Sequence, residues 1–90
     1  MKRLSQTRQF SKDVKRVARR GKDLGKLRQI VLTLARDGTL NVRHRDHALT
    51  GEWKGARDCH IEPDWILIYM STETELRLER TGTHSDLFRQ

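Results

Sequence analysis

The sequence predicts a small α+β fold in which a two-helix hairpin packs on one face of a mostly antiparallel sheet. The chain has 90 residues, of which 34% are hydrophobic, so its core supports about two layers of secondary structure. Apolar residues recur at helical spacing as far as residue 38, and beyond it their spacing changes toward two. These observations predict the order β-α-α-β-β-β in a single domain covering residues 1–90.

The first two elements are expected to be a short strand and a helix. Residues 2–7, KRLSQT, are the candidate strand. Four apolar residues then follow at positions i, i+4, i+7 and i+8, which puts them in one stripe along a helix. Thr7 is a possible N-cap, and Gly21 is a natural end. The stripe consists of Phe10, Val14, Val17 and Ala18.

A second helix is expected directly afterwards. Asp23 can cap its start, and Gly38 marks its end. The connection RGKD between the helices is short, which favours an antiparallel helical hairpin. The apolar face of this second helix consists of Leu24, Leu27, Ile30, Val31, Leu34 and Ala35.

The rest of the chain is typical of a three-stranded meander. Residues 41–49 are interpreted as loop or irregular strand, and 49–55, with two glycines, as a turn region. Strands are expected at 56–62, 65–70 and 76–81. The middle one is continuously apolar, as a central strand covered by helices would be. The helices cover one sheet face, so the other face is predicted to stay open and to offer room for a site.

Charge is distributed unevenly along the chain, whose formal net charge is +7. Residues 1–45 hold 14 Lys and Arg against 3 Asp and Glu, whereas residues 46–90 hold 5 against 9. A basic half beside an acidic half indicates a surface that docks on a polyanion and a separate site. The basic residues expected to contact RNA from the first helix are Lys15, Arg16 and Arg19.

The cellular setting is indicated by what the sequence lacks. It has no run of about 18 apolar residues, so no membrane span or membrane partner is expected. The basic start is not followed by an apolar segment, so it is not a secretory signal. Cys59 is the only cysteine, which excludes an internal disulfide and fits a reducing, cytoplasmic compartment.

Histidines and aspartates gather in the acidic half, near the ends of the expected strands. The candidate catalytic residues are His47, Asp58, His60, Asp64 and His84. RNA carries its own nucleophile, the ribose 2′-OH, so cleavage needs a base, an acid and a cation that stabilises the charged phosphorane. Histidine can serve as either acid or base near neutral pH. The chemistry requires no metal and no cofactor, and it excludes DNA as substrate.

Further residues are candidates for binding RNA around this cluster. Lys54, Arg57 and Arg80 can stabilise negative charge, and Phe88 can stack on a base. Trp65 is expected in the core, where the apolar strand begins. Trp53, in a turn flanked by glycines, is equally compatible with packing and with stacking on a nucleobase.

A zinc site and a cysteine nucleophile are the two alternatives to this cluster. Zinc could be bound by His47, His60 and Asp64, but their spacing matches no compact ligand pattern. Cys59 could act as a nucleophile, but it shares a strand face with Ile61, so a buried and inert thiol is expected.

Three blocks of sequence resemble the YafQ-type toxins of the RelE/ParE toxin superfamily. They are DHALTGEWKG at 46–55, HIEPDWILIY at 60–69 and RTGTH at 80–84, and QFSKDVKR at 9–16 fits the start of the family's first helix. The resemblance covers nearly the whole chain. It implies a RelE-like fold, with two helices on a small, mostly antiparallel sheet, in agreement with the order above.

The resemblance also implies an activity. Such toxins are ribosome-dependent endoribonucleases that cleave mRNA in the decoding site, and a small acidic antitoxin silences them. By analogy, His84 is the leading acid or base. His47, His60 and Asp64 supply the opposite proton transfer and orientation, and Phe88 holds an mRNA base. Asp58 also falls in the matched motif. The resemblance does not tell which residue is acid and which is base.

Two positions depart from the family pattern, and two alternative functions remain. Position 56 is Ala where an aromatic residue is expected, and His44 lies outside the motif and is expected to be solvated. ParE-like relatives are non-catalytic and lack the histidine set. A simple nucleic-acid-binding module would explain the basic half but not the His and Asp cluster.

Overall fold

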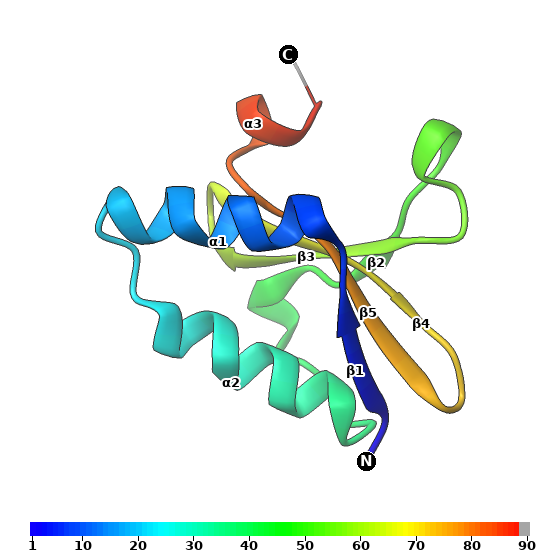
Figure 1. Ribbon diagram of the computed structural model, residues 1–90. Helices are drawn as coiled ribbons and strands as arrows, with labels where there is room; N and C mark the ends of the chain where they lie inside the picture. Colours follow the sequence, from blue (N-terminus) through cyan, green and yellow to red (C-terminus); the bar gives the residue numbers. More distant parts are fainter. Residues whose placement is uncertain (89–90) are drawn as a thin grey trace.

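The computed structural model describes residues 1–88, and its centre is one five-stranded sheet (Figure 1). The strand order is β1-β5-β4-β3-β2. Only β1 runs parallel to its neighbour, β5, and the other pairs are antiparallel. The strands are β1 Arg3–Gln6, β2 His47–Ala48, β3 Arg57–Glu62, β4 Trp65–Ser71 and β5 Glu75–Gly82. The predicted α+β fold with a mostly antiparallel sheet is therefore confirmed.

Two helices, α1 (Arg8–Arg19) and α2 (Leu24–Ala35), lie side by side on one face of this sheet (Figure 1). Their predicted caps are confirmed. The Thr7 hydroxyl accepts a hydrogen bond from the Phe10 amide at 3.0 Å, and the Asp23 carboxylate accepts one from Gly25 at 2.9 Å. Each bond satisfies an amide that the helix itself cannot pair.

Three short helical segments were not anticipated. They are η1 (Val42–His44) and η2 (Gly51–Trp53), both 3₁₀ turns, and α3 (His84–Phe88). None is long enough to produce a periodic apolar pattern, which explains why the sequence analysis missed them. The α3 turn is defined by a reciprocal cap, in which the Thr83 amide donates to the Asp86 carboxylate at 2.9 Å and the Asp86 amide to the Thr83 hydroxyl at 3.1 Å.

The main core lies between the two long helices and the sheet. Trp65 is 1% exposed, as predicted, and its indole N–H donates to the Thr81 hydroxyl at 2.9 Å. Cys59 is fully buried here, and burial raises the pKa of its thiol to about 12. A thiol with that pKa is not a nucleophile at neutral pH, so the expected buried and inert cysteine is confirmed.

A second, smaller core occupies part of the opposite sheet face. Its buried members are Ala56, Ile66, Ile68 and Leu87, against which Leu49, Trp53, Met70 and Phe88 pack. The expectation of an open face is therefore wrong over this part, because α3 and the segment around η2 fold over it. Trp53 is half-buried in this cluster, which favours packing over a free stacking platform.

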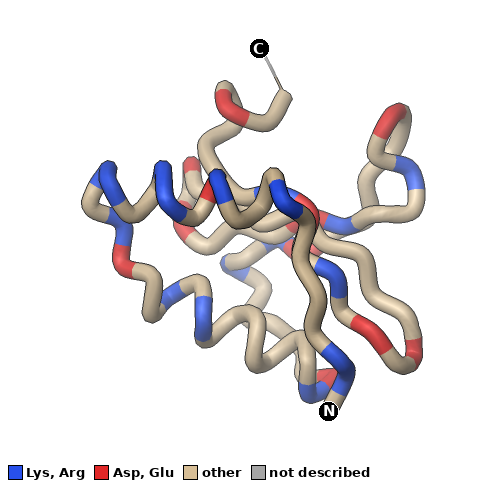
Figure 2. Tube along the Cα trace, viewed as in Figure 1, with Lys and Arg blue, Asp and Glu red and all other residues tan. Residues whose placement is uncertain are grey.

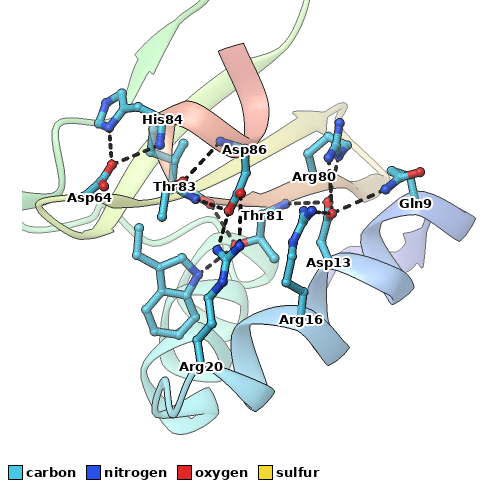
Figure 3. A network of polar contacts seen from close by, with 12 residues as sticks. Gln9, Asp13, Arg16, Arg20, Asp64, Arg80, Thr81, Thr83, His84 and Asp86 are labelled. Atoms are coloured by element: carbon cyan, nitrogen blue, oxygen red, sulfur yellow. Dashed lines mark hydrogen bonds and ion pairs between the residues drawn. The ribbon is translucent and has the colours of Figure 1, made fainter. Parts of the chain in front are cut away.

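A buried carboxylate, Asp13, joins α1 to the end of β5 (Figure 3). Its side chain is fully buried and accepts hydrogen bonds from Arg80 Nε at 2.7 Å, Arg16 Nη2 at 2.5 Å and the Thr81 amide at 3.2 Å. A buried charge is tolerated only where such partners replace water. The sequence contained a signal for this, because Asp13 lies between Phe10 and Val17 on the apolar face of the helix.

Basic residues are concentrated on the N-terminal part of the structure, as Figure 2 shows along α1 and the start of α2. Lys15 and Arg19 are exposed on α1, whereas Arg16 is partly tied to Asp13. Acidic residues lie mainly on the later strands and turns (Figure 2). None of the helices in the described part of the chain is both long and apolar enough to cross a membrane.

Replacing Asp13 with alanine is expected to destabilise the fold by about 3 kcal/mol, because Arg80 and the Thr81 amide would lose their buried partner. Urea unfolding measures the change. Glu73→Ala, which removes an exposed carboxylate on the β4–β5 turn, is the control and should change stability by less than about 0.5 kcal/mol. Equal effects of the two substitutions would contradict this account of Asp13.

Candidate active site

Strand register brings His47, Asp58 and His60 to one sheet face. His47 on β2 is paired with Asp58 on β3, and directly paired residues share a face. His60 lies two residues beyond Asp58 on the same strand, so it points the same way. The predicted common face of Asp58 and His60, opposite Cys59 and Ile61, is confirmed.

The His47 ring is oriented by the backbone and lies against a buried carboxyl group. Its Nδ1 lies 2.6 Å from the Arg45 carbonyl oxygen and 3.1 Å from Asp58 Oδ1. The carbonyl can only accept, so Nδ1 carries the proton and Nε2 is left as an acceptor. Asp58 is 4% exposed, and its Oδ1 makes no hydrogen bond of good geometry. Burial raises the pKa of Asp58, although His47, His60 and His84 act in the opposite direction.

The second carboxylate, Asp64, holds His84 from the β3–β4 turn (Figure 3). Its Oδ1 accepts hydrogen bonds from the His84 amide at 2.9 Å and from ring Nδ1 at 2.6 Å. These two bonds lower the pKa of Asp64. They also place the ring proton on Nδ1 and fix the ring plane, which leaves Nε2 for a substrate.

His60 and His84 meet at the centre of the cluster. Their ring centroids are 5.3 Å apart, and the rings are inclined at 76°. The Phe88 ring lies 6.3 Å from His84 on the other side. Burial lowers the pKa of His60 below that of a free imidazole, so this ring is neutral at pH 7. The structure thus joins all five predicted catalytic residues and Phe88 in one chain of neighbours.

An ion pair that the sequence did not reveal secures α3. Arg20, at the end of α1, donates to both carboxylate oxygens of Asp86, at 2.6 and 3.3 Å (Figure 3). These bonds hold the pKa of Asp86 well below its usual range. A helix of one turn is marginal by itself, so α3 depends on this pair, on Asp64 and on buried Leu87 to keep His84 in place.

The predicted cations have different partners, and Arg57 lies on the sheet face opposite the cluster, because it pairs with Tyr69 of the main core. Arg80 is bound by Asp13, and Arg57 is 3.2 Å from Asp46, which also accepts a hydrogen bond from the Tyr69 hydroxyl. Lys54 is exposed just after η2. Their roles toward RNA stay predictions, as do those of Lys15, Arg16 and Arg19 on α1.

His44 is a correction to the sequence analysis, which expected it to be solvated. It is half-buried, and its Nδ1 lies 2.6 Å from the His60 carbonyl oxygen. This contact anchors η1 to β3 beside the cluster. No sequence pattern indicated it, because the two residues are 16 positions apart and meet only through the fold.

The chain was compared with known proteins. A family model described as "Bacterial toxin of type II toxin-antitoxin system, YafQ" matches residues 2–89. The mRNA interferase toxin YafQ of Escherichia coli K12 is 54% identical over 82 residues, which is 89% of this chain and 88% of the relative. The chain belongs to the YafQ toxin family.

Solved structures of bacterial toxins agree with this assignment. The crystal structure of YafQ from E. coli BL21(DE3) has a TM-score of 0.92 at 46% identity, covering 98% of this chain and 99% of that one. A crystal structure of an E. coli DinJ–YafQ complex has a TM-score of 0.91 at 47% identity, with the same coverage. A copper-bound mutant toxin from Helicobacter pylori has a TM-score of 0.93 at 41% identity, covering 98% and 100%.

Metal ligation was tested on the side chains of this chain. Within residues 1–88, no three His, Cys, Asp or Glu side chains are arranged to hold a metal ion. Of the candidate zinc ligands, His47 Nδ1 is bound to the Arg45 carbonyl oxygen and Asp64 to His84, so these two side chains already have other partners.

Loss of the Arg20–Asp86 pair is expected to loosen α3 without unfolding the sheet. In Arg20→Ala and in Asp86→Asn, the amide hydrogens of residues 84–87 should exchange with solvent several-fold faster. The reason is that loss of the ion pair lowers the free energy needed to unfold α3 locally. Hydrogen exchange measured by NMR reports this directly. Arg8→Ala removes a charge from the same helix without touching α3 and should leave these amides unchanged. Unaltered exchange in both Arg20→Ala and Asp86→Asn would show that Leu87 and Asp64 are enough to hold α3 in place.

Proposed function

We propose that this chain is an mRNA interferase, the toxin of a type II toxin–antitoxin pair, which cleaves mRNA on the translating ribosome. The observation that carries the proposal is the pair of histidines, His60 and His84, with ring centroids 5.3 Å apart and a carboxylate beside each. The name of the E. coli relative, an mRNA interferase, supports the same activity. Residues 1–90 would act as one RelE-like domain.

The proposed reaction uses the ribose 2′-OH as nucleophile. His60, neutral because of burial, accepts the 2′-OH proton as the oxygen attacks the adjacent phosphorus. His84, held through Nδ1 by Asp64, donates a proton from Nε2 to the 5′-oxygen as the P–O5′ bond breaks. The products of this step are a 2′,3′-cyclic phosphate and a 5′-hydroxyl. The protein's own groups complete the proton balance, without a metal or cofactor.

The remaining residues of the cluster serve orientation and charge in this proposal. Asp58 faces both His47 and His60 and opposes the lowering of the His60 pKa. His47, with Nε2 free as an acceptor, would bind a ribose hydroxyl. Lys54 and Arg80 supply positive charge to the RNA in this proposal, and Phe88 stacks on a base next to His84. Arg57 pairs with Tyr69 on the sheet face opposite Asp58 and His60, so we propose that it contacts RNA away from the reacting phosphorus.

Ribosome dependence is supported by the separation of the basic surface from the cluster. Lys15, Arg16 and Arg19 lie on α1, on the sheet face opposite Asp58 and His60, so ribosomal RNA and mRNA can be bound together. The ribosome would then position the substrate. An acidic antitoxin as second partner is supported by the DinJ–YafQ complexes. With these two partners, the proposed activity would be cytoplasmic.

Replacing His84 with alanine is expected to reduce mRNA cleavage by at least about 100-fold, because one proton transfer is lost. The measurement is the mapping of mRNA 5′ ends with translating ribosomes. Ser85→Ala, at an exposed neighbouring position, is the matched control and should cleave normally. If His84→Ala gives the wild-type pattern, the nuclease proposal fails. Unchanged RNA binding would then favour the non-catalytic binding module.

The pH dependence of cleavage should report on His60. The base must be neutral, so the rate rises with pH through an apparent pKa below about 6.5, the value of a free imidazole. Asp58 raises the His60 pKa, so Asp58→Asn should move this acidic limb to lower pH. Glu52→Gln, an exposed charge change on η2, should leave it in place. A shift to higher pH in Asp58→Asn would contradict His60 as the base.

A further inference from the structure

A groove of about 1050 Å³ lies beside the histidine cluster, along the free edge of β3. It exists because β2 pairs only with Arg57 and Asp58, so that within residues 1–88 the second half of β3 has no strand on that side. Helix α2 forms one wall and η1 the other, and His60 and His84 also line it. The bond from His44 to the His60 carbonyl holds η1 at this edge.

Two arginines line the η1 wall, Arg43 within η1 and Arg45 directly after it. Within the described residues, neither Arg43 nor Arg45 forms an ion pair, whereas Lys26 on the opposite wall is bound by Glu62 at 2.8 Å. The Asn41 side chain caps η1 by accepting from the Arg43 amide at 3.0 Å. The position of this wall is therefore defined by the fold.

The backbone at Arg45 also connects the groove to the cluster. Arg45 adopts a left-handed conformation with φ of 48°, which is uncommon for a residue with a side chain. In this conformation its carbonyl oxygen accepts from His47 Nδ1 while its side chain lines the groove. The residue that fixes the His47 ring thus presents a guanidinium group next to the reacting centre.

We propose that this groove binds the mRNA nucleotide adjoining the scissile linkage, with Arg43 and Arg45 contacting its phosphate. The inference rests on the proposed function, because an RNA strand placed between His60 and His84 must continue past them. A guanidinium group matches a phosphate with two parallel donors. Gln29, on the α2 wall, presents an amide to the edge of the base. Phosphate contacts of this kind set the register of the strand.

RNA is favoured over a peptide as the occupant because the groove and the histidine cluster are continuous. Any ligand that fills the groove reaches His60 and His84, and a bound mRNA already occupies that end. The cationic wall also suits a strand with one negative charge per nucleotide. An acidic antitoxin segment is the competing occupant, and the experiment below separates the two.

The test pairs a change in the protein with a change in the RNA. Short mRNAs are programmed into ribosomes with a neutral methylphosphonate at the linkage either 5′ or 3′ of the scissile one. The protein variant is Arg43→Ala/Arg45→Asn, in which Asn tolerates the left-handed backbone. Single-turnover cleavage by wild type should slow about tenfold with one of the two modified RNAs. The variant should cleave the unmodified RNA about tenfold more slowly than wild type does. The methylphosphonate that slows wild type should then cause no further decrease in the cleavage rate of the variant.

Two controls exclude a general effect of removing positive charge and unfolding of the variant. Arg36→Ala, an exposed arginine at the end of α2 outside the groove, should respond to the methylphosphonate as wild type does. Unfolding curves establish that the double variant is folded. The proposal would be overturned if the arginine substitutions and the methylphosphonate reduced the cleavage rate independently of each other. It would also be overturned if the variant cleaved the unmodified RNA normally. Normal cleavage with weakened binding of an acidic antitoxin peptide would also overturn it and assign the groove to the antitoxin.

The proposal can fail without the proposed function failing. His84→Ala tests the chemistry with every RNA, modified or not. If that variant loses cleavage while Arg43→Ala/Arg45→Asn keeps it, the nuclease stands and the groove does not bind the adjoining nucleotide.

Discussion

The arrangement of the molecule depends on the buried carboxylate of Asp13. Its bonds to Arg80 and to the Thr81 amide fasten α1 to the last residues of β5. The chain leaves the sheet at that point and turns into α3, which carries His84. Arg20, near the end of the same helix, then holds α3 through Asp86. One helix therefore supports both the exit of β5 and the segment that carries the central histidine, because a single helical turn has little stability of its own.

In the histidine cluster, unlike the rest of the protein, a carboxylate is buried without a full set of hydrogen-bond partners. Asp58 is buried with an oxygen that makes no good hydrogen bond, whereas the equally buried Asp13 has four donors around it. Burying such a group lowers stability, so its presence beside His47 and His60 is better explained by a role in tuning histidines than by folding. The two carboxylates also differ in environment. Burial raises the pKa of Asp58, and hydrogen bonds lower that of exposed Asp64. That contrast supports the proposal of different roles for His60 and His84.

Some parts of this site could be predicted from residues close in sequence and others could not. The common face of Asp58 and His60 follows from alternation along one strand. The contacts between His47 and Asp58, or Asp64 and His84, depend on strand register and on where β5 ends, and no local pattern encodes either. Two further contacts, between His44 and the edge of β3 and between Arg20 and Asp86, likewise result from packing of segments that are distant in the sequence. The bare edge that forms the groove arises because β2 has only two residues, too short to be recognised from alternation.

The sequence by itself determined the order of the longer elements, the two long helices with their caps, the central apolar strand and the family. These features depend on local periodicity, on capping residues and on motifs, all of which are linear. Only the tertiary structure decided that Asp13 is buried, that α3 covers part of the second sheet face and that the histidines meet. These features depend on contacts between segments that are far apart in the sequence. Burial of the two cores brings the segments together, and its free energy depends on the apolar area and the shape of the surfaces, not on position in the chain.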